Sequence, residues 1–404
     1  MQADIAIIGA GPAGLAAATR LAAQGIGRVA VIEREPQPGG IPRHCGHSPF
    51  GMREFHRILG GQAYAARLAA GARAAGATIL CDTTAIALLP GPALELSGPG
   101  GVTRLSARAV LLATGTRESS RVQRMIGGQK PGGILTTGAL QGIVHLNHQR
   151  PFLRPVVLGT EVVSFSALLT CRQAGIRPAA MIEPGPRVVA RRGAGLLPRL
   201  LGVPLMLTTR ITRIIGRDRV EAVAVEGPDG AHQIAADGVL LTGAFRSEAG
   251  LLAMAGLALD PLSTGPVIDS FGRLDQPGFF AAGNLLRPVE TAGACWAEGL
   301  RAADAIAAHL AGALPGRAGA LPLRIDGDAI RYALPQLILP AGPGRHDHIQ
   351  LRVARPVVGE LRLMQQDRVI ARQRIDARPE RRVTMPIPPG LGQGPLVLAL
   401  EKRR

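Results

Sequence analysis

The chain has 404 residues, with 46 Lys or Arg against 29 Asp or Glu, and its formal net charge is +17. A charge of this size is typical of proteins that bind nucleic acid or anionic membranes. However, Lys130 and Lys402 are the only lysines, and arginine occurs with abundant Ala, Gly and Pro, all of which have GC-rich codons. Only 3% of the residues are aromatic, so little is present to stack on bases. We therefore expect no nucleic-acid partner, and the length predicts two or three globular domains.

The four cysteines are far apart in the chain and form no CxxC pair: Cys45, Cys81, Cys171 and Cys295. They therefore predict neither a disulfide framework nor a zinc ribbon nor an iron–sulfur site, and they fit reduced thiols in the cytoplasm. The first apolar run begins by residue 5, and no later stretch of 18 residues is both apolar and uncharged. We expect no leader peptide and no membrane span.

An apolar run, a glycine-rich turn and an alanine-rich helix follow one another from residue 5 onward. Gly9 permits a tight turn, Gly11 lets the backbone approach a pyrophosphate, and Gly14 lets the helix pack closely on the strand. The phosphates then lie at the positive N-terminal end of the helix. Glu33 ends the next apolar run 19 residues later (33 − 14), where a carboxylate accepts from an adenosine ribose hydroxyl. The pattern predicts a dinucleotide site with these contacts: Gly9, Gly11, Pro12, Ala13, Gly14, Glu33 and Arg34.

Strand-like and helix-like runs alternate through the first domain, which we place at residues 1–150 and 260–314. The strand-like runs are 5–9, 28–33, 78–80 and 108–115, and the helical runs are 13–24 and 61–75. Residues 90–101 contain the turn residues of a hairpin. This order predicts an α/β fold with a doubly wound, mostly parallel sheet.

A second unit of the same kind, placed at residues 151–259, repeats the spacing of the first. The interval from Gly159 to Glu183 is 24 residues (183 − 159), as it is from Gly9 to Glu33 (33 − 9). Glu161 then replaces the second glycine and Ser164 the third. The Glu161 carboxylate blocks backbone approach and repels a pyrophosphate, so NAD(P) is disfavoured there. The second unit is then either a structural relic or a site for another ligand.

The rest of the chain completes the first domain and the second unit and adds a third domain. A β-rich stretch at 204–243, with a hairpin at Asp229-Gly230, closes the second unit. The strand 278–284 and the helix 297–311 return to the first domain. Short β-like runs follow at 349–353, 357–363 and 383–387, and predict a small all-β domain over 315–404. That stretch has 16 Arg or Lys against 8 Asp or Glu, which fits either a docking surface for an acidic partner or a solvated face.

The motifs together resemble the two-dinucleotide-binding-domain flavoproteins over roughly residues 1–312. The resemblance rests on the N-terminal fingerprint, on Gly39-Gly40, on the strand end at 113–115 and on the late motif 280–284. It implies FAD as the cofactor. Asn284 stands where relatives often have Asp, and it can still bond a ribityl hydroxyl or a phosphate. The implied further contacts are Gly40, Ile41, Ala85, Ala113, Thr114, Gly115, Gly283, Asn284, Thr291 and Ala292.

Residues 39–51 are similar to those of the FAD/NAD(P)-binding subunit of amino-acid, opine and hydroxyproline dehydrogenases and of hydrogen cyanide synthase. Residues 132–141 resemble a segment of the sarcosine oxidase large subunit. The resemblance implies a dehydrogenase that oxidises a small amine, amino acid or hydroxy compound and passes electrons to a partner protein or a quinone. Members of that group commonly carry a cysteine-rich C-terminal iron–sulfur segment, whereas this chain has no cysteine after Cys295. The alternatives are an NAD(P)H-dependent flavin reductase and a non-catalytic electron-transfer subunit of a heteromeric dehydrogenase.

Flavin oxidation of a C–H bond requires a base for the amine or hydroxyl proton. In similar proteins the 39–51 loop lies against the flavin, so His47, Cys45 and His44 are the catalytic candidates, and His47 is favoured as the base. Cys45 lies where disulfide reductases have a redox cysteine, but those use two closely spaced thiols. The histidine pairs 44/47, 145/148 and 346/348 lack the further ligands of a metal site. We therefore expect no metal, and Trp296 is either a pocket wall or core.

Overall fold

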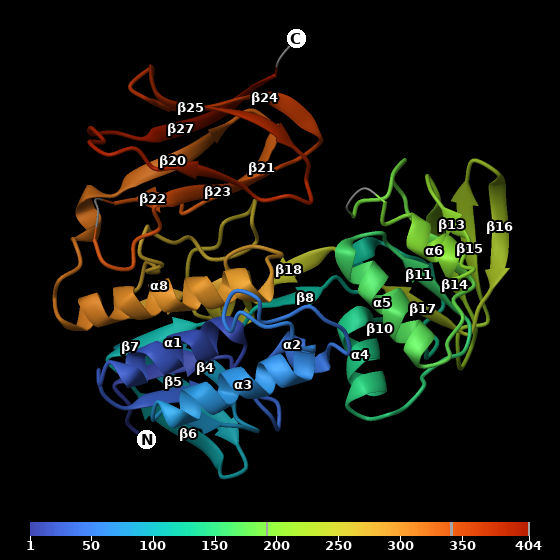
Figure 1. Cartoon of the computed structure of the whole chain (residues 1–404), viewed down its shortest axis with the longest axis horizontal. Helices are drawn as coiled ribbons and strands as arrows, with labels where there is room; N and C mark the ends of the chain where they lie inside the picture. The colour runs from blue at the N-terminus through green and yellow to red at the C-terminus, as the bar shows by residue number, and fades with distance from the viewer. Residues whose placement is uncertain (191–192, 340–341, 403–404) are drawn as a thin grey trace.

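The computed structural model describes residues 1–190, 193–339 and 342–402. The chain forms two α/β units and a C-terminal β domain (Figure 1). This is the predicted fold class. None of the described helices is long and apolar enough to cross a bilayer.

The first unit is built on a five-stranded parallel sheet in the order β19-β7-β1-β2-β3. Its strands are β1 (Ile5–Ile8), β2 (Val29–Ile32), β3 (Thr78–Leu80), β7 (Ala109–Leu112) and β19 (Phe279–Ala281). Ile5 and Ile7 face a core formed with the helices, whereas Ala6 and Ile8 face a second core. Because both faces are covered, the central strands are apolar without interruption.

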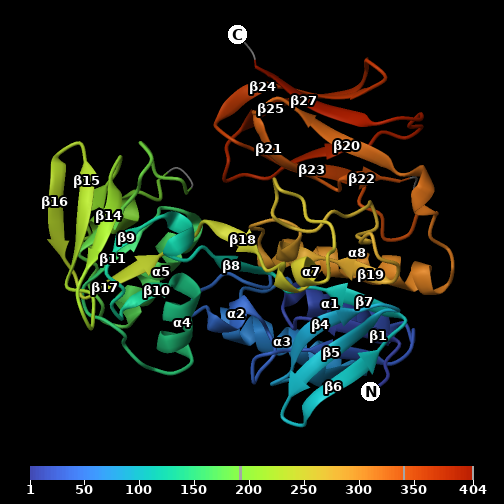
Figure 2. The ribbon, with the colours of Figure 1, turned by 180° about the vertical axis from the view of Figure 1, so that it is seen from behind.

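Helices cover one face of this sheet and an antiparallel sheet covers the other (Figure 2). The helices are α1 (Pro12–Ala23), α3 (Gly61–Ala74) and α8 (Ala292–Leu310). The antiparallel strands are β4 (Thr84–Leu89), β5 (Ala93–Gly98) and β6 (Gly101–Ser106), so the predicted hairpin is present. Helix α8 begins five residues before its expected start at 297 (297 − 292), because the Thr291 hydroxyl accepts a hydrogen bond from the Ala294 amide and caps it.

The second unit repeats this architecture with the sheet order β10-β17-β11-β12-β13. Its parallel strands are β10 (Ile134–Thr136), β11 (Pro155–Leu158), β12 (Ala180–Ile182), β13 (Leu205–Met206) and β17 (Gly238–Leu241). A further sheet combines β9 (Gly127–Gly128), β14 (Arg210–Ile215), β15 (Ala222–Gly227) and β16 (Gly230–Ala235). The helices are α4 (Thr137–His145), α5 (Val162–Gln173) and α6 (Leu196–Leu200).

Two short antiparallel strands join the two units: β8 (Thr116–Glu118) leads out of the first and β18 (Phe245–Ser247) returns to it. Strands β9 and β10 pair with strands of the second unit, although they lie within residues 1–150. The crossing from one unit to the other therefore occurs at β8. The remaining short helices are α2 (Ile41–His44), α7 (Gly250–Met254), η1 (Val122–Arg124), η2 (Gly283–Leu285) and η3 (Arg317–Gly319).

The C-terminal domain consists of two sheets around a shared apolar core. One sheet has the order β22-β20-β27-β24-β25 and the other β21-β23-β26. The strands are β20 (Leu321–Asp326), β21 (Ile330–Leu334), β22 (Leu337–Ile338), β23 (His348–Val353), β24 (Val357–Gln365), β25 (Arg368–Ala377), β26 (Val383–Pro386) and β27 (Leu396–Lys402). The three β-like runs expected from the sequence correspond to β23, β24 and β26. The domain lies on the side of the first unit where α8 runs (Figure 1).

Candidate functional site

Three segments far apart in the sequence meet at the N-terminus of α1. A Cβ built on Gly9 would lie 2.5 Å from the Ala113 carbonyl oxygen, and one on Gly40 would lie 2.8 Å from the Gly11 Cα. A Cβ built on Gly283 would lie 2.9 Å from the Ala13 Cβ. The strand end at 113–115, the loop before α2 and the late motif therefore converge on the glycine-rich turn.

The turn leaves room for a phosphate group at one position and none at another. A Cβ built on Gly14 would lie 1.9 Å from the Gly9 carbonyl oxygen, so this glycine serves the packing of α1 on β1. A Cβ built on Gly11 would meet only the Gly40 Cα, at 4.0 Å, and Gly115 has no neighbour within 4 Å of a built Cβ. Backbone at Gly11 thus faces open space at the N-terminal end of a helix, which is the geometry of a diphosphate cradle.

Glu33 holds this turn in shape. Its carboxylate is buried and accepts hydrogen bonds from the Ala10 amide at 2.9 Å and from the Glu35 amide at 3.0 Å. A carboxylate has about four acceptor positions, so capacity for a ribose hydroxyl remains. The Thr83 amide donates to the Glu33 carbonyl, which places Ala85, at the start of β4, close by. Arg34 is exposed.

The late motif leads into the N-terminus of α8. The Asn284 side chain donates to the Glu290 carbonyl at 3.2 Å and accepts from the Glu290 amide at 2.7 Å, so it closes the loop between them. Thr291 caps α8, and Ala292 is its first residue. A Cβ built on Gly299 would lie 2.1 Å from the Ala13 carbonyl oxygen. Close packing of α8 on α1 therefore fixes the late motif beside the cradle.

The loop from Gly39 to Gly51 carries the three candidate catalytic side chains. Burial raises the pKa of the Cys45 thiol to about 11, so this group is a thiol rather than a thiolate near neutral pH. Burial, followed by the charge of Arg43, lowers the pKa of His44, whose buried Nδ1 has no hydrogen-bond partner among the described residues. The His47 ring stacks on Phe50 with centroids 5.4 Å apart.

Helix α4 brings residues of the second unit to this loop. A Cβ built on Gly46 would lie 2.2 Å from the His145 ring, and the Cys45 Sγ lies 3.6 Å from the Gln141 Oε1. Burial, followed by the charge of His47, lowers the pKa of His145. The sequence suggests His145 only as a metal ligand, although residues 132–141, just before it, resemble a flavoprotein segment. No group of three or more His, Cys, Asp or Glu among the described residues could hold a metal ion.

Glu118, at the end of the connecting strand β8, is a second residue that sequence reasoning missed. Its carboxylate accepts from the Gly138 amide at the start of α4 and from the Gly243 amide after β17, both at 2.9 Å. Burial raises the pKa of Glu118, and these two hydrogen bonds oppose that rise. The only available signal was its place at the end of a short polar strand.

The second cradle has the turn of the first but carries a glutamate where the first has Gly11. Gly159 has a φ of +113°, close to the +103° of Gly9. The Glu183 carboxylate accepts from the Thr160 hydroxyl at 2.5 Å and from the Gly185 amide at 2.9 Å, as Glu33 accepts from its own turn. The Glu161 carboxylate folds back and accepts from the Ala244 amide at 2.7 Å, next to Gly243. A carboxylate thus occupies the mouth of this cradle.

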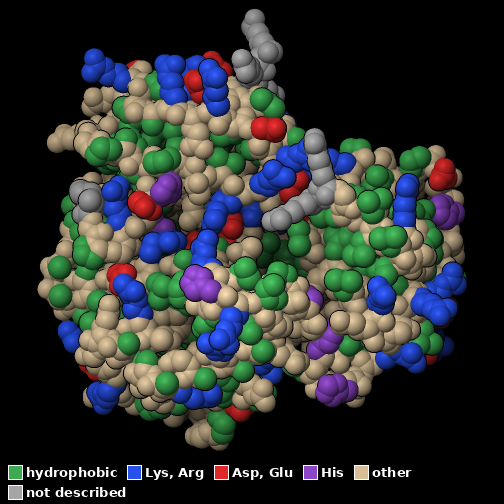
Figure 3. All heavy atoms as spheres, viewed as in Figure 1, with side chains coloured by type: hydrophobic (Ala, Val, Ile, Leu, Met, Phe, Trp, Pro, Cys, Tyr) green, Lys and Arg blue, Asp and Glu red, His purple; other side chains and the backbone are tan. Residues whose placement is uncertain are grey.

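A hollow lies between the second unit and the C-terminal domain, and Lys and Arg side chains gather along it (Figure 3). Among the described residues, an ion pair bridges the two parts: Arg187 Nη2 lies 3.3 Å from Glu380 Oε2 in the loop before β26. The same loop carries Arg382, which contacts Glu290. The C-terminal domain therefore contacts both units at the side where the late motif lies.

Comparisons with known proteins agree with this geometry. The family model for pyridine nucleotide-disulphide oxidoreductases matches residues 3–299. An opine oxidase subunit from Rhizobium meliloti (strain 1021) is 32% identical over 206 residues, which are 51% of this chain and 42% of that protein. The corresponding opine oxidase subunit from Agrobacterium tumefaciens (strain Ach5) is 28% identical over 319 residues, 70% of this chain and 61% of that protein. The chain thus spans only part of the length of these curated relatives.

Two solved structures show the same fold. Thioredoxin reductase of T. acidophilum is similar with a TM-score of 0.63 at 20% identity, over 76% of this chain and 98% of that chain. L-Proline dehydrogenase of P. horikoshii is similar with a TM-score of 0.58 at 18% identity, over 78% of this chain and 57% of that chain. With the family match over residues 3–299, the fold and the cradle define an FAD-dependent oxidoreductase. The chain belongs to the pyridine nucleotide-disulphide oxidoreductase family.

Proposed function

We propose that the chain is a dehydrogenase subunit that oxidises a small amine, amino acid or hydroxy compound and passes the electrons to a partner protein or a quinone. Bound FAD supplies the hydride acceptor for this chemistry. The observation that carries the proposal is the difference between the two cradles: Gly11 faces open space, whereas the second turn carries Glu161, whose carboxylate lies beside Gly243 and Ala244.

This difference argues against NAD(P)H as the source of electrons. A pyrophosphate at the second cradle would lie against the Glu161 carboxylate and lose the close backbone approach that a glycine permits. The first cradle has no acidic side chain at this position and keeps the helix N-terminus accessible. Reducing equivalents are therefore expected to come from an organic substrate.

Two residues of the 39–51 loop are proposed for proton transfer. His47 stays a candidate base, as expected from the sequence. His44 is supported by its buried Nδ1, which has no hydrogen-bond partner among the described residues. Burial lowers the pKa of His44, which keeps the imidazole neutral near pH 7 but also makes it a weaker base. Cys45 is a protonated, buried thiol, so we propose that it packs against Gln141 rather than reacts.

The experiment is anaerobic stopped-flow reduction of the FAD-loaded chain. A panel of amino acids, opines and hydroxy acids should bleach the flavin absorbance, while NADH and NADPH should not. The Glu161→Gly variant, which restores the glycine, should gain reduction by a nicotinamide nucleotide. Rapid bleaching of the wild type by NADH or NADPH would show that the carboxylate does not close the second cradle.

A second candidate is a flavin-carrying electron-transfer subunit, with substrate oxidation on another chain. It is favoured by the similarity to two proteins named as subunits, of which this chain spans 42% and 61%. In the same experiment neither substrates nor nicotinamide nucleotides would then bleach the flavin of the isolated chain. Addition of a reduced partner subunit would do so.

A further inference from the structure

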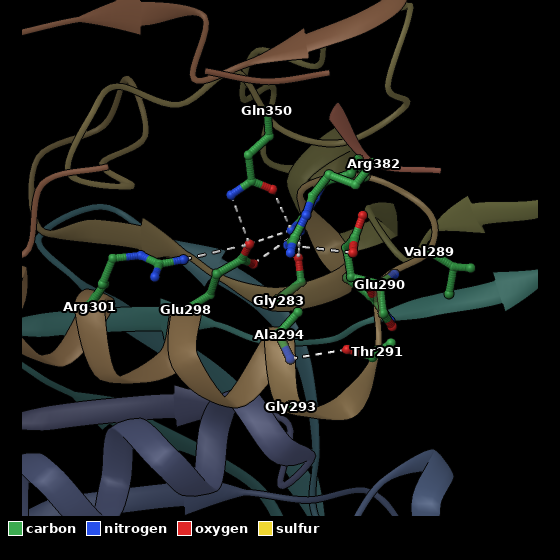
Figure 4. A network of polar contacts seen from close by, with 12 residues as sticks. Gly283, Val289, Glu290, Thr291, Gly293, Ala294, Glu298, Arg301, Gln350 and Arg382 are labelled. Carbon is green, nitrogen blue, oxygen red and sulfur yellow. Dashed lines mark hydrogen bonds and ion pairs between the residues drawn. The ribbon is translucent and has the colours of Figure 1, made fainter. Parts of the chain in front are cut away.

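The loop from Arg287 to Thr291 connects the late motif to α8 and faces the C-terminal domain. Asn284 closes the loop through Glu290, and Thr291 then caps the helix. Figure 4 shows this loop between α8 and the C-terminal domain. Its conformation therefore depends on the groups that face it from that domain.

The inner side of the loop is fixed by a buried ion pair. Arg287 and Glu298 are each 1% exposed in their side chains and form two hydrogen bonds with each other. Arg287 Nη1 also donates to the Gly283 carbonyl at 2.8 Å. Gln350, on β23 of the C-terminal domain, accepts from Arg287 at 3.0 Å and donates to Glu298 at 3.3 Å. The C-terminal domain thus completes a polar network that reaches the late motif.

The outer side of the loop is held by two arginines of the same domain. Arg352, on β23, donates to the Val289 carbonyl at 2.5 Å and lies 3.1 Å from the Glu290 carboxylate. Arg382 lies 3.5 Å from the other Glu290 oxygen. The Tyr332 hydroxyl donates to the Pro288 carbonyl at 3.2 Å. Consecutive residues of the loop are therefore each bound by a side chain from the C-terminal domain.

These contacts are stronger than ordinary surface contacts. The side chains of Arg352 and Glu290 are only 13% and 8% exposed. Charge-assisted hydrogen bonds in such surroundings are less screened than exposed pairs. By contrast, the Arg355–Asp328 pair in the same domain has side chains 45% and 78% exposed, and pairs of that kind contribute little.

We propose that the C-terminal β domain is a structural part of the flavin site, with Arg352 as the positioning residue that holds the loop 287–291 against it. The proposal rests on the proposed function, because it assumes that FAD occupies the first unit beside the late motif. It assigns the domain a role within the chain, in addition to any role as a docking surface. Arg352 acts through Val289 and Glu290, so it is expected to order the loop whether or not the cofactor is present.

The test compares Arg352→Gln with Arg355→Gln in the full-length chain. The Glu290 amide donates to Asn284, and hydrogen exchange of the apo protein should show this amide exchanging about tenfold faster in Arg352→Gln and unchanged in Arg355→Gln. FAD titration should show about tenfold weaker binding in Arg352→Gln, a difference of about 1.4 kcal/mol. Arg352→Lys keeps a positive charge near Glu290, so its loop exchange and its FAD affinity should lie between those of Arg352→Gln and the wild type. If Arg352→Gln does not fold, Arg352→Lys takes its place in both measurements.

The outcomes separate the two proposals. If the wild type binds FAD and Arg352→Gln binds it equally well with unchanged loop exchange, the positioning role is overturned while the proposed function stands. If exchange rises over the whole C-terminal domain but FAD affinity is unchanged, Arg352 only stabilises that domain, and the positioning role is again overturned. If the wild type binds no FAD, both proposals fall together.

Discussion

The Gly11→Ala substitution separates cofactor binding from folding. Gly11 has φ −82° and ψ −175°, an extended conformation that alanine adopts without strain. The built Cβ meets only the Gly40 Cα at 4.0 Å, an ordinary van der Waals distance. Alanine is a poorer N-cap than glycine by roughly 0.5 to 1 kcal/mol, but it restricts the unfolded chain by a similar amount, about 0.4 to 1 kcal/mol. The two terms offset each other, so the thermal midpoint of the apo protein should move by no more than about 2 °C.

The FAD affinity should respond very differently. The added methyl points into the space where backbone and diphosphate must come close, so we expect binding to weaken at least about a hundredfold, or about 2.7 kcal/mol. Isothermal titration or flavin fluorescence of the apo protein measures this. In Gly14→Ala the built Cβ lies 1.9 Å from a carbonyl oxygen, so that variant should lose about 3 kcal/mol or more of stability. Wild-type FAD affinity in Gly11→Ala would refute the assignment of the cradle.

Three further predictions concern buried groups. In the Cys45→Ser variant, substrate should reduce the flavin at the wild-type rate, and a loss of rate above about tenfold would assign the thiol a chemical role. The native Cys45 thiol, whose pKa is raised to about 11, should react slowly with iodoacetamide at pH 7. Burial, followed by the charge of Arg301, lowers the pKa of His346 to about 4, whereas the unfolded chain binds this proton near pH 6.5. The free energy of unfolding should therefore be highest above pH 6.5 and should fall by up to about 3 kcal/mol as the pH drops toward 4. Thermal or urea unfolding across this range measures the change. Glu298→Gln leaves the Arg287 charge buried without its carboxylate and should lower stability by about 3 kcal/mol. Glu360→Gln removes a much less buried partner of Arg362 and should leave stability nearly unchanged.

The sequence predicted the two α/β units because their signals are local. Each signal lies within one strand–helix–strand unit: the glycine turn, the apolar runs and the 24-residue spacing, which is the same for Gly9–Glu33 (33 − 9) and Gly159–Glu183 (183 − 159). The crossing point between the units was harder to find, since β8 and β18 are short and pair across more than a hundred residues. Helix α8 was placed too late because its first turn is made of small residues with no apolar period.

The network around Arg287 could not be predicted from the sequence. Glu298 lies in α8 among residues that resemble an exposed helix face, and Gln350 follows 52 residues later (350 − 298). Polar residues at such separations are paired only by the tertiary fold, which buries all three. The direction of the Glu161 side chain likewise cannot be predicted from the sequence, although its position in the turn predicts that it repels a pyrophosphate.

Glu33 and Glu183 show that the scaffold of such a turn and its ligand preference are set by different residues. Each carboxylate ties down the two segments beside its own turn from within the chain, without help from a bound nucleotide. The copy that carries Glu161 therefore keeps its shape whether or not anything occupies it. Two units whose turns are held from within in this way can differ in the ligand they bind while they share one fold.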